Sequence, residues 1–119
     1  MRFSAYNLII ESELTLPELL PCLNACLPDV HILIGSVSDD GLPSGQQLGP
    51  FLWVATDTLW LLIPHIARFI ISKGNEIVID PEPGIDEDSL RVFLLGSAIG
   101  ALLFQQGYLV LHSNSHYDG

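Results

Sequence analysis

The clearest hydrophobic pattern lies in the last third of the chain, where it predicts one long helix. Apolar or small residues recur at steps of three and four from Leu90 to Leu102, which is the spacing of one helical face. Further apolar residues, such as Val92 and Phe104, occupy the remaining faces. A helix that is apolar nearly all round is normally buried. We therefore expect a buried helix over 87–106.

The residues at the two ends of this helix are typical of caps. Asp86 precedes it, and a carboxylate there can accept hydrogen bonds from the free N–H groups of the first turn. Gly107 follows it and suits the left-handed position that ends many helices. The next residues, 108–112, form an apolar run that predicts a final strand.

Shorter segments rich in β-branched and aromatic residues predict strands before the helix. These segments are Arg2–Ile10, Val30–Ile34, Phe51–Ala55, Thr58–Ile63, Ala67–Ser72 and Glu76–Asp80. The last two flank Lys73, Gly74 and Asn75, a sequence typical of a hairpin turn. We predict an α+β fold, in which a mostly antiparallel sheet of about six strands packs on the long helix.

The chain is short enough to form a single domain over 1–119. Residues 35–50 are rich in Gly, Ser, Pro and Asp and are expected to form a mobile loop. The predicted core consists of apolar residues on the inward faces of the strands and the helix. They are Leu8, Ile32, Ile34, Leu61, Ile70, Ile77, Ile79, Phe93, Leu94, Ala101, Leu102 and Val110.

Composition limits the kinds of partner. Four basic residues against fourteen acidic ones give a net charge of −10, whereas nucleic acids and anionic membranes are bound by clustered Lys and Arg. The mean hydropathy is +0.43, which suggests that some apolar surface contacts a partner. The apolar run Val92–Phe104 is shorter than the roughly 20 residues of a membrane span. No secretion signal is recognised, so we expect a cytoplasmic protein that contacts neither membrane nor nucleic acid.

Individual polar residues give only weak indications of chemistry. Cys22 and Cys26 have neither the spacing of a redox motif nor two further zinc ligands nearby, so we expect reduced thiols. His31 lies within a predicted strand and is interpreted as an ordinary sheet residue. Five carboxylates crowd between Asp80 and Asp88, but their spacing fits no calcium loop. Three of them suit the start of the helix.

The C-terminal residues His112, His116 and Asp118 suggest one further hypothesis, a metal-dependent hydrolase. These residues follow a predicted strand and do not share a helical face. A nucleophilic site would also need an oxyanion-binding group, which the sequence does not display. The residues alone therefore define no complete active site, and we predict neither a cofactor nor a metal.

Four stretches are informative when they are taken together: RFSAYNLIIESELTLPEL, EIVIDPEPGIDED, RVFLLGSAIGALLFQQG and LVLHSNS. In this order they resemble the N-terminal portion of the HPr kinase/phosphorylase-like serine kinases, including those that accompany lasso-peptide biosynthesis. The resemblance spans nearly all of the chain. In that family, a β-rich segment and such a helix are followed by a strand with a Leu-His pair, and then by the Walker A loop that holds ATP.

The resemblance implies that Leu111 and His112 match the family's Leu-His pair, with Ser113 in place of a small residue. His112 would then lie at the edge of a nucleotide site, with ATP and Mg²⁺ as cofactors, provided that a kinase domain follows. This sequence reaches Gly119 without a G-x-x-x-x-G-K-[ST] motif. We therefore expect that it neither binds ATP tightly nor transfers phosphate by itself.

Two classes of function stay open. The first is a non-catalytic accessory domain of a serine kinase, which packs on the kinase catalytic domain or recognises a peptide or protein substrate. The second is an independent binding or assembly module. In either case the apolar strand edge expected at Tyr108–Leu111 predicts a homodimer.

Overall fold

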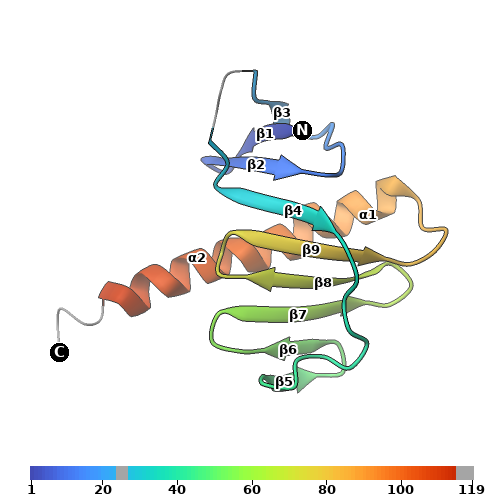
Figure 1. Ribbon diagram of the computed structural model, residues 1–119, viewed down its shortest axis with the longest axis vertical. Coiled ribbons are helices and arrows are strands. Elements are labelled where there is room, and N and C mark those ends of the chain that lie inside the picture. Colours follow the sequence, from blue (N-terminus) through green and yellow to red (C-terminus); the bar gives the residue numbers. More distant parts are fainter. Residues whose placement is uncertain (24–26, 115–119) are drawn as a thin grey trace.

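The computed structural model describes residues 1–23 and 27–114, with side chains described up to residue 107. Within these residues the chain forms a nine-stranded mixed sheet and one C-terminal helix (Figure 1). The strands are β1 (Arg2–Ala5), β2 (Leu8–Ser12), β3 (Leu20–Pro21), β4 (Val30–Ile34), β5 (Gln46–Gly49), β6 (Leu52–Val54), β7 (Thr58–Ile63), β8 (Ala67–Ser72) and β9 (Glu76–Pro81). The α+β class is confirmed, but the predicted sheet of about six strands is too small.

The sheet consists of two antiparallel units joined by one strand. Its order is β3-β1-β2-β4-β9-β8-β7-β6-β5. From β5 to β9 each strand pairs antiparallel with the next, and β1 pairs antiparallel with both β2 and β3. Strand β4 lies parallel to β2 on one side and to β9 on the other. These two parallel pairings were not predicted, because they depend on where β4 inserts in space.

Two tight turns set the registers of the hairpins. The predicted strand Arg2–Ile10 is split at Tyr6 and Asn7, which have φ values of 56° and 60°. Two consecutive positive φ angles are typical of the type I′ turn, whose twist matches that of the flanking strands. Neither residue is glycine, so the sequence carried no strong turn signal there. The hairpin predicted around Lys73 and Gly74 is confirmed, and it contains the same kind of turn.

The helical segment has three parts: α1 (Glu87–Phe93), the π-helical turn η1 (Leu94–Ala98) and α2 (Ile99–Asn114). The predicted N-cap is confirmed, because the Asp86 carboxylate accepts a hydrogen bond from the N–H of Ser89 at 2.9 Å.

The predicted end at Gly107 and the predicted strand 108–112 are both wrong, since α2 continues through them. A short apolar run does not distinguish a strand from a helix. Extending an existing helix adds one hydrogen bond for each residue fixed, whereas a new strand would need a partner.

The π-helical turn keeps the buried side of the helix aligned with the sheet. Leu90, Leu94, Ala98 and Leu102 are all buried, at steps of four residues. An α-helix turns once in about 3.6 residues, so steps of four drift around its surface. The wider η1 turn, in which the N–H of Ile99 bonds to the carbonyl of Leu94, compensates for this drift.

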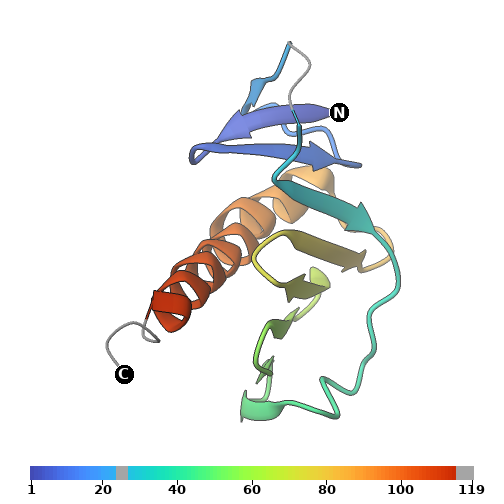
Figure 2. The same cartoon turned by 60° about the vertical axis from the view of Figure 1, so that its left-hand side comes forward.

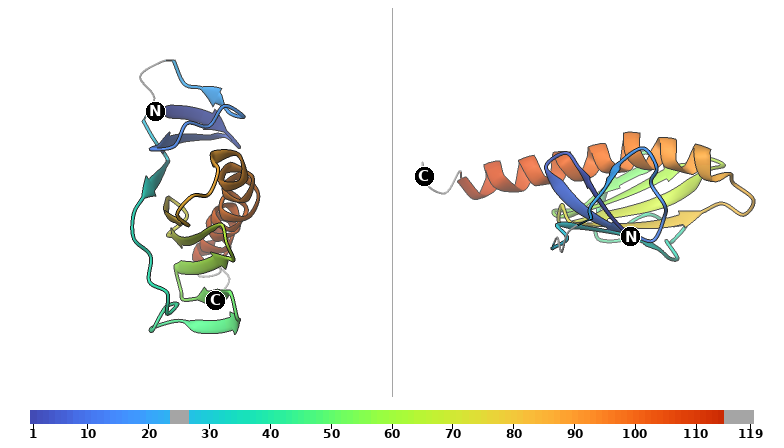
Figure 3. Two further views of the ribbon diagram at one scale, coloured as in Figure 1. Left: turned by 90° about the vertical axis from the view of Figure 1, so that its right-hand side faces the viewer. Right: turned by 90° about the horizontal axis from the view of Figure 1, so that it is seen from above.

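The two faces of the sheet are covered by different elements (Figure 3). The helix lies on one face, and residues 35–45, here called the strap, cross the other on their way from β4 to β5. Of the segment 35–50 predicted as a mobile loop, the last part forms β5, and Val37 in the strap is buried. Its mobility stays a prediction.

The predicted core is partly confirmed. Ile32, Ile77, Ile79, Leu94 and Leu102 are fully buried. Ile34 is 47% exposed because it lies at the end of β4, so its assignment to the core was wrong. The other predicted core residues are only half-buried, with the exception of Val110, which lies beyond the described side chains. These half-buried residues are Leu8, Leu61, Ile70, Phe93 and Ala101.

Candidate functional site

An open apolar pocket lies between α2 and the β5–β7 part of the sheet. Its volume is about 320 Å³. The lining residues come from three strands, the turn before β7 and the helix. They are Leu48, Val54, Ala55, Thr56, Leu59, Phe104 and Gln105.

The register of the strands explains why apolar side chains face this pocket. Residues directly opposite each other in a sheet share one face. Leu59 lies opposite Ile71, which is fully buried in the core, and Val54 lies opposite Leu59. The apolar face that packs on the helix at β8 therefore continues outward through β7 to β6.

The helix does not follow this face to its edge. Figure 2 shows the helix beside the β1–β4, β9 and β8 part of the sheet, with β5 and β6 extending away from it. On β7, the side chains of Leu59, Leu61 and Ile63 still pack against the buried cluster, whereas Val54 is not among the described residues that do so. The pocket thus lies where the apolar face of the sheet extends beyond the part that the helix covers.

Two glutamines fix the helix at the inner wall of the pocket. The buried Gln105 carboxamide accepts a hydrogen bond from the Gly74 N–H at 3.0 Å and donates one to the Ile71 carbonyl at 2.9 Å. Gln106 donates to the Gly74 carbonyl at 2.7 Å. A Cβ atom at Gly74 would lie only 2.8 Å from Gln106, so this turn needs glycine both for its φ of 68° and for space. Sequence reasoning missed this clamp, because nothing in the pattern links Gln105 to a distant hairpin.

Exposed apolar side chains form the rim of the pocket. Leu48 is 58% exposed and Phe104 is 72% exposed. Val92, on the outer side of the same helix, is 66% exposed. The prediction that the helix is buried nearly all round is therefore wrong, since only one sheet face covers it.

The strap is held against the opposite face by several specific bonds. The indole N–H of the buried Trp60 donates to the Ser38 carbonyl at 2.8 Å. The Asp80 carboxylate accepts from the Val37 N–H at 2.9 Å and from the Arg68 guanidinium at 3.0 Å. Arg68 also pairs with Asp39 of the strap. The bond from Val37, followed by that from Arg68, lowers the pKa of Asp80 below its ordinary value.

Three of the five carboxylates between Asp80 and Asp88 have structural roles. Asp80 anchors the strap, and Asp86 caps α1. The hydrogen bonds that Asp86 accepts from the N–H and then from the hydroxyl of Ser89 lower the pKa of Asp86. Asp88 pairs with Arg91, which also donates to Glu18 at 3.0 Å and so ties α1 to the chain before β3. Among the side chains that the structure describes, those of residues 1–23 and 27–107, no group of three His, Cys, Asp or Glu is placed to hold a metal ion.

The predicted C-terminal site lies largely outside the described part of the chain. His112 belongs to α2 and not to a strand, and its side chain is among those not described. His116 and Asp118 lie outside the described residues, so the hydrolase hypothesis stays a prediction. His31 is an exposed residue of β4, as expected for an ordinary sheet residue.

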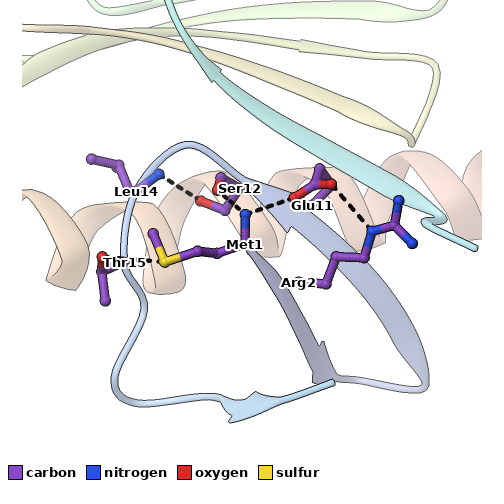
Figure 4. A network of polar contacts seen from close by, with 6 residues as sticks. All are labelled: Met1, Arg2, Glu11, Ser12, Leu14 and Thr15. Carbon is purple, nitrogen blue, oxygen red and sulfur yellow. Dashed lines mark hydrogen bonds and ion pairs between the residues drawn. The ribbon is translucent and has the colours of Figure 1, made fainter. Parts of the chain in front are cut away.

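A separate polar network fixes the N-terminal strand (Figure 4). The α-amino group of Met1 pairs with the Glu11 carboxylate at 2.8 Å, and the Arg2 guanidinium binds its other oxygen at 3.1 Å. These two cations lower the pKa of Glu11. The buried Ser12 hydroxyl accepts from the Leu14 N–H at 3.0 Å and stabilises the turn that follows β2. The network is far from the pocket and has a structural role.

The structure bears on two further predictions, the reduced state of the cysteines and the absence of membrane contact. Cys22 is disulfide-bonded, so the prediction of a reduced thiol at this position is wrong; the other cysteine, Cys26, lies outside the described residues. One helical stretch in the described chain, Glu87–Gly107, has the length and the mean hydropathy, 1.3, of a membrane span, and 33% of it is buried. Cytoplasmic location and the absence of membrane contact therefore stay predictions.

Comparison of the chain with family models, curated proteins and solved structures finds no match. The resemblance to serine kinases consequently stays an expectation from the sequence. The geometry of the apolar pocket and its rim is the main basis for inferring a function.

Proposed function

We propose that this chain is a non-catalytic protein-binding domain with a scaffold, substrate-recognition or assembly role. The observation that carries the proposal is the apolar sheet face around Val54 and Leu59, which continues past the helix into an open pocket with an exposed rim. Apolar residues scattered singly on a surface need no explanation, but a contiguous apolar patch is typical of an interaction site.

The resemblance to HPr kinase-like serine kinases suggests which partners to test first. They are a kinase catalytic domain that carries a Walker A loop, and the peptide or protein that such a kinase phosphorylates. In this view the chain contributes recognition, while nucleotide and Mg²⁺ bind to the catalytic domain.

A binding selection on the intact chain tests the proposal directly. Immobilised protein is offered a phage-displayed library of random peptides, and enriched sequences are synthesised and measured by calorimetry. We expect saturable binding by at least one enriched family of peptides. A selection that enriches nothing above an unrelated acidic control protein would contradict the proposal.

A nucleotide titration tests the non-catalytic part separately. We expect no heat of binding when Mg·ATP is titrated to about 1 mM, because no phosphate-binding loop is recognised. Micromolar affinity for Mg·ATP would show that the chain binds nucleotide and would contradict this part of the proposal.

Self-assembly is the second candidate function. Residues Tyr108–Leu111, where a strand edge was predicted, lie in α2, so a homodimer would not form by strand pairing there. Edge strands β3 and β5 carry the exposed residues Leu20 and Leu48, and unpaired strand edges are known to associate. Light scattering at about 100 μM tests this, since a weak dimer of ordinary interface size should be visible there. A monomeric mass would count against self-assembly.

A further inference from the structure

We infer that the pocket between α2 and β5–β7 receives one large apolar side chain from a basic segment of a partner protein. This inference rests on the proposed binding function and specifies its site and chemistry. It depends on the chemistry of the pocket lining, on the size of the pocket together with its rim, and on the net charge of the chain.

The described lining residues offer few polar groups that could select a polar ligand. None of the lining residues that the structure describes is charged. Both ends of the Gln105 carboxamide are already used, by Gly74 and by Ile71. Among the described lining residues, the Thr56 hydroxyl is then the one remaining side-chain polar group. Sites for metabolites usually contain several convergent polar groups that fix the ligand, so an apolar occupant fits better.

The size and the rim favour a side chain over a free small molecule. A volume of about 320 Å³ is at the lower end of ligand sites, and it accommodates one aromatic or large aliphatic group. Leu48 and Phe104 extend the apolar surface outside the pocket. A small ligand enclosed in the pocket would leave the outer parts of these two side chains in water, whereas a protein segment can cover them.

Charge distinguishes a foreign partner from a second copy. The chain has a net charge of −10. Three of its four basic side chains are in ion pairs with carboxylates, namely Arg2 with Glu11, Arg68 with Asp80 and Arg91 with Glu18. At this pocket a second copy would bring a further ten negative charges and is disfavoured, whereas a segment rich in Lys or Arg is attracted.

The test uses peptides selected from the random library on the intact protein. We expect the enriched sequences to combine one aromatic or large aliphatic residue with several Lys or Arg residues. Their affinity is then measured for three variants. Ala55→Trp fills the pocket, Phe104→Ser removes part of its wall, and Val92→Trp adds an indole to an exposed site of the same helix outside the pocket.

We expect the dissociation constant to rise at least about tenfold for Ala55→Trp and for Phe104→Ser, and to stay unchanged for Val92→Trp. Replacing the apolar residue of the peptide by Ala should weaken binding by a similar factor. Thermal unfolding shows whether each variant is folded. If Ala55→Trp is not folded, the comparison of Phe104→Ser with Val92→Trp decides.

Four other results would overturn the inference. Peptides that bind all three variants equally well would place the binding site elsewhere and leave the proposed function intact. Peptides without basic residues that bind as tightly would remove the charge argument. A wild-type dimer that Ala55→Trp dissociates would assign the pocket to a second copy. A selection that enriches nothing would contradict the proposed function as well.

Discussion

The two halves of the sheet differ in how their faces are covered. Around β4, β9 and β8, the helix covers one face, so that Ile32, Ile79 and Phe69 are fully buried. Around β5 and β6 the strap still reaches the second face, where Gly41 lies against Trp53. On the first face, however, Val54 borders an open pocket. The comparison separates a half that is built for stability from a half whose apolar surface is available to a partner.

The largest expected effect comes from the same substitution made in each half. Leu94→Ala removes a fully buried side chain of the helical segment in the covered half, and we expect a loss of about 3 kcal/mol in the free energy of unfolding. Leu48→Ala removes a side chain that is 58% exposed, and the change should stay within about 0.5 kcal/mol. Urea unfolding of both variants measures the difference. Equal losses would show that the β5 side is packed as tightly as the core.

The second prediction concerns the glutamine clamp at the boundary between the halves. Gln105→Leu keeps the size of the side chain but leaves the Gly74 N–H and the Ile71 carbonyl without this partner. We expect a loss of about 2 kcal/mol and faster hydrogen exchange of the Gly74 amide. Gln47→Leu, on the exposed edge strand β5, is the matched control and should be nearly neutral. An unchanged Gly74 exchange rate in Gln105→Leu would refute the clamp.

The third prediction concerns pH and the strap. The pKa of Asp80 in the folded protein is below its unfolded value of about 3.9, because the carboxylate is bonded to Val37 and Arg68. Its contribution is therefore fully present above about pH 4 and is lost as the pH falls through the lower folded value. We expect Asp80→Asn to cost about 1 kcal/mol at pH 7. The difference from wild type should shrink progressively below pH 4.

The wild-type protein will lose stability in acid for other reasons too, since the pKa values of Glu11, Glu18 and Asp86 are also lowered. The informative quantity is the difference between wild type and Asp80→Asn at each pH. A difference that stays constant from pH 7 to pH 2 would mean that the charge of Asp80 does not hold the strap.

The smallest effect on stability is expected at the rim of the pocket. Phe104→Ala removes an aromatic side chain that is 72% exposed, so the free energy of unfolding should change by no more than about 0.5 kcal/mol. Thermal unfolding measures this. A large loss would mean that Phe104 belongs to the core, and that the pocket is a defect in packing and not a place for a partner.

Local sequence signals predicted the elements that depend on neighbouring residues. The hairpin of β8 and β9 is confirmed because its alternating pattern and its turn lie within one short segment. The cap at Asp86 is confirmed for the same reason. The split of the first strand was missed because Tyr6 and Asn7 adopt positive φ without being glycine. The strand expected at 108–112 was wrong because an apolar run of this length suits either kind of element.

The candidate site could not be predicted in the same way. In the sequence, Val54, Leu59 and Phe104 look like ordinary apolar residues of a strand or a helix, and Leu48 lies in a segment predicted as a loop. They line a pocket only because the helix ends its contact with the sheet at β8 and β7, and because the clamp at Gln105 fixes it there. This arrangement depends on pairings between distant parts of the chain, which hydrophobic periodicity does not report.

The position of β4 has a consequence for the order in which the molecule assembles. Its pairing with β9 joins His31 to Glu76, about 45 positions apart along the chain. Closing so long a connection costs more entropy than forming the neighbouring hairpins, and non-local pairings slow folding. We expect β5 to β9 to fold first as a meander. Strand β4 then pairs with β9, and this pairing places the strap, residues 35–45, across the sheet. Until β4 pairs with β9, the edges of these two strands are unpaired and can pair with strands of other molecules.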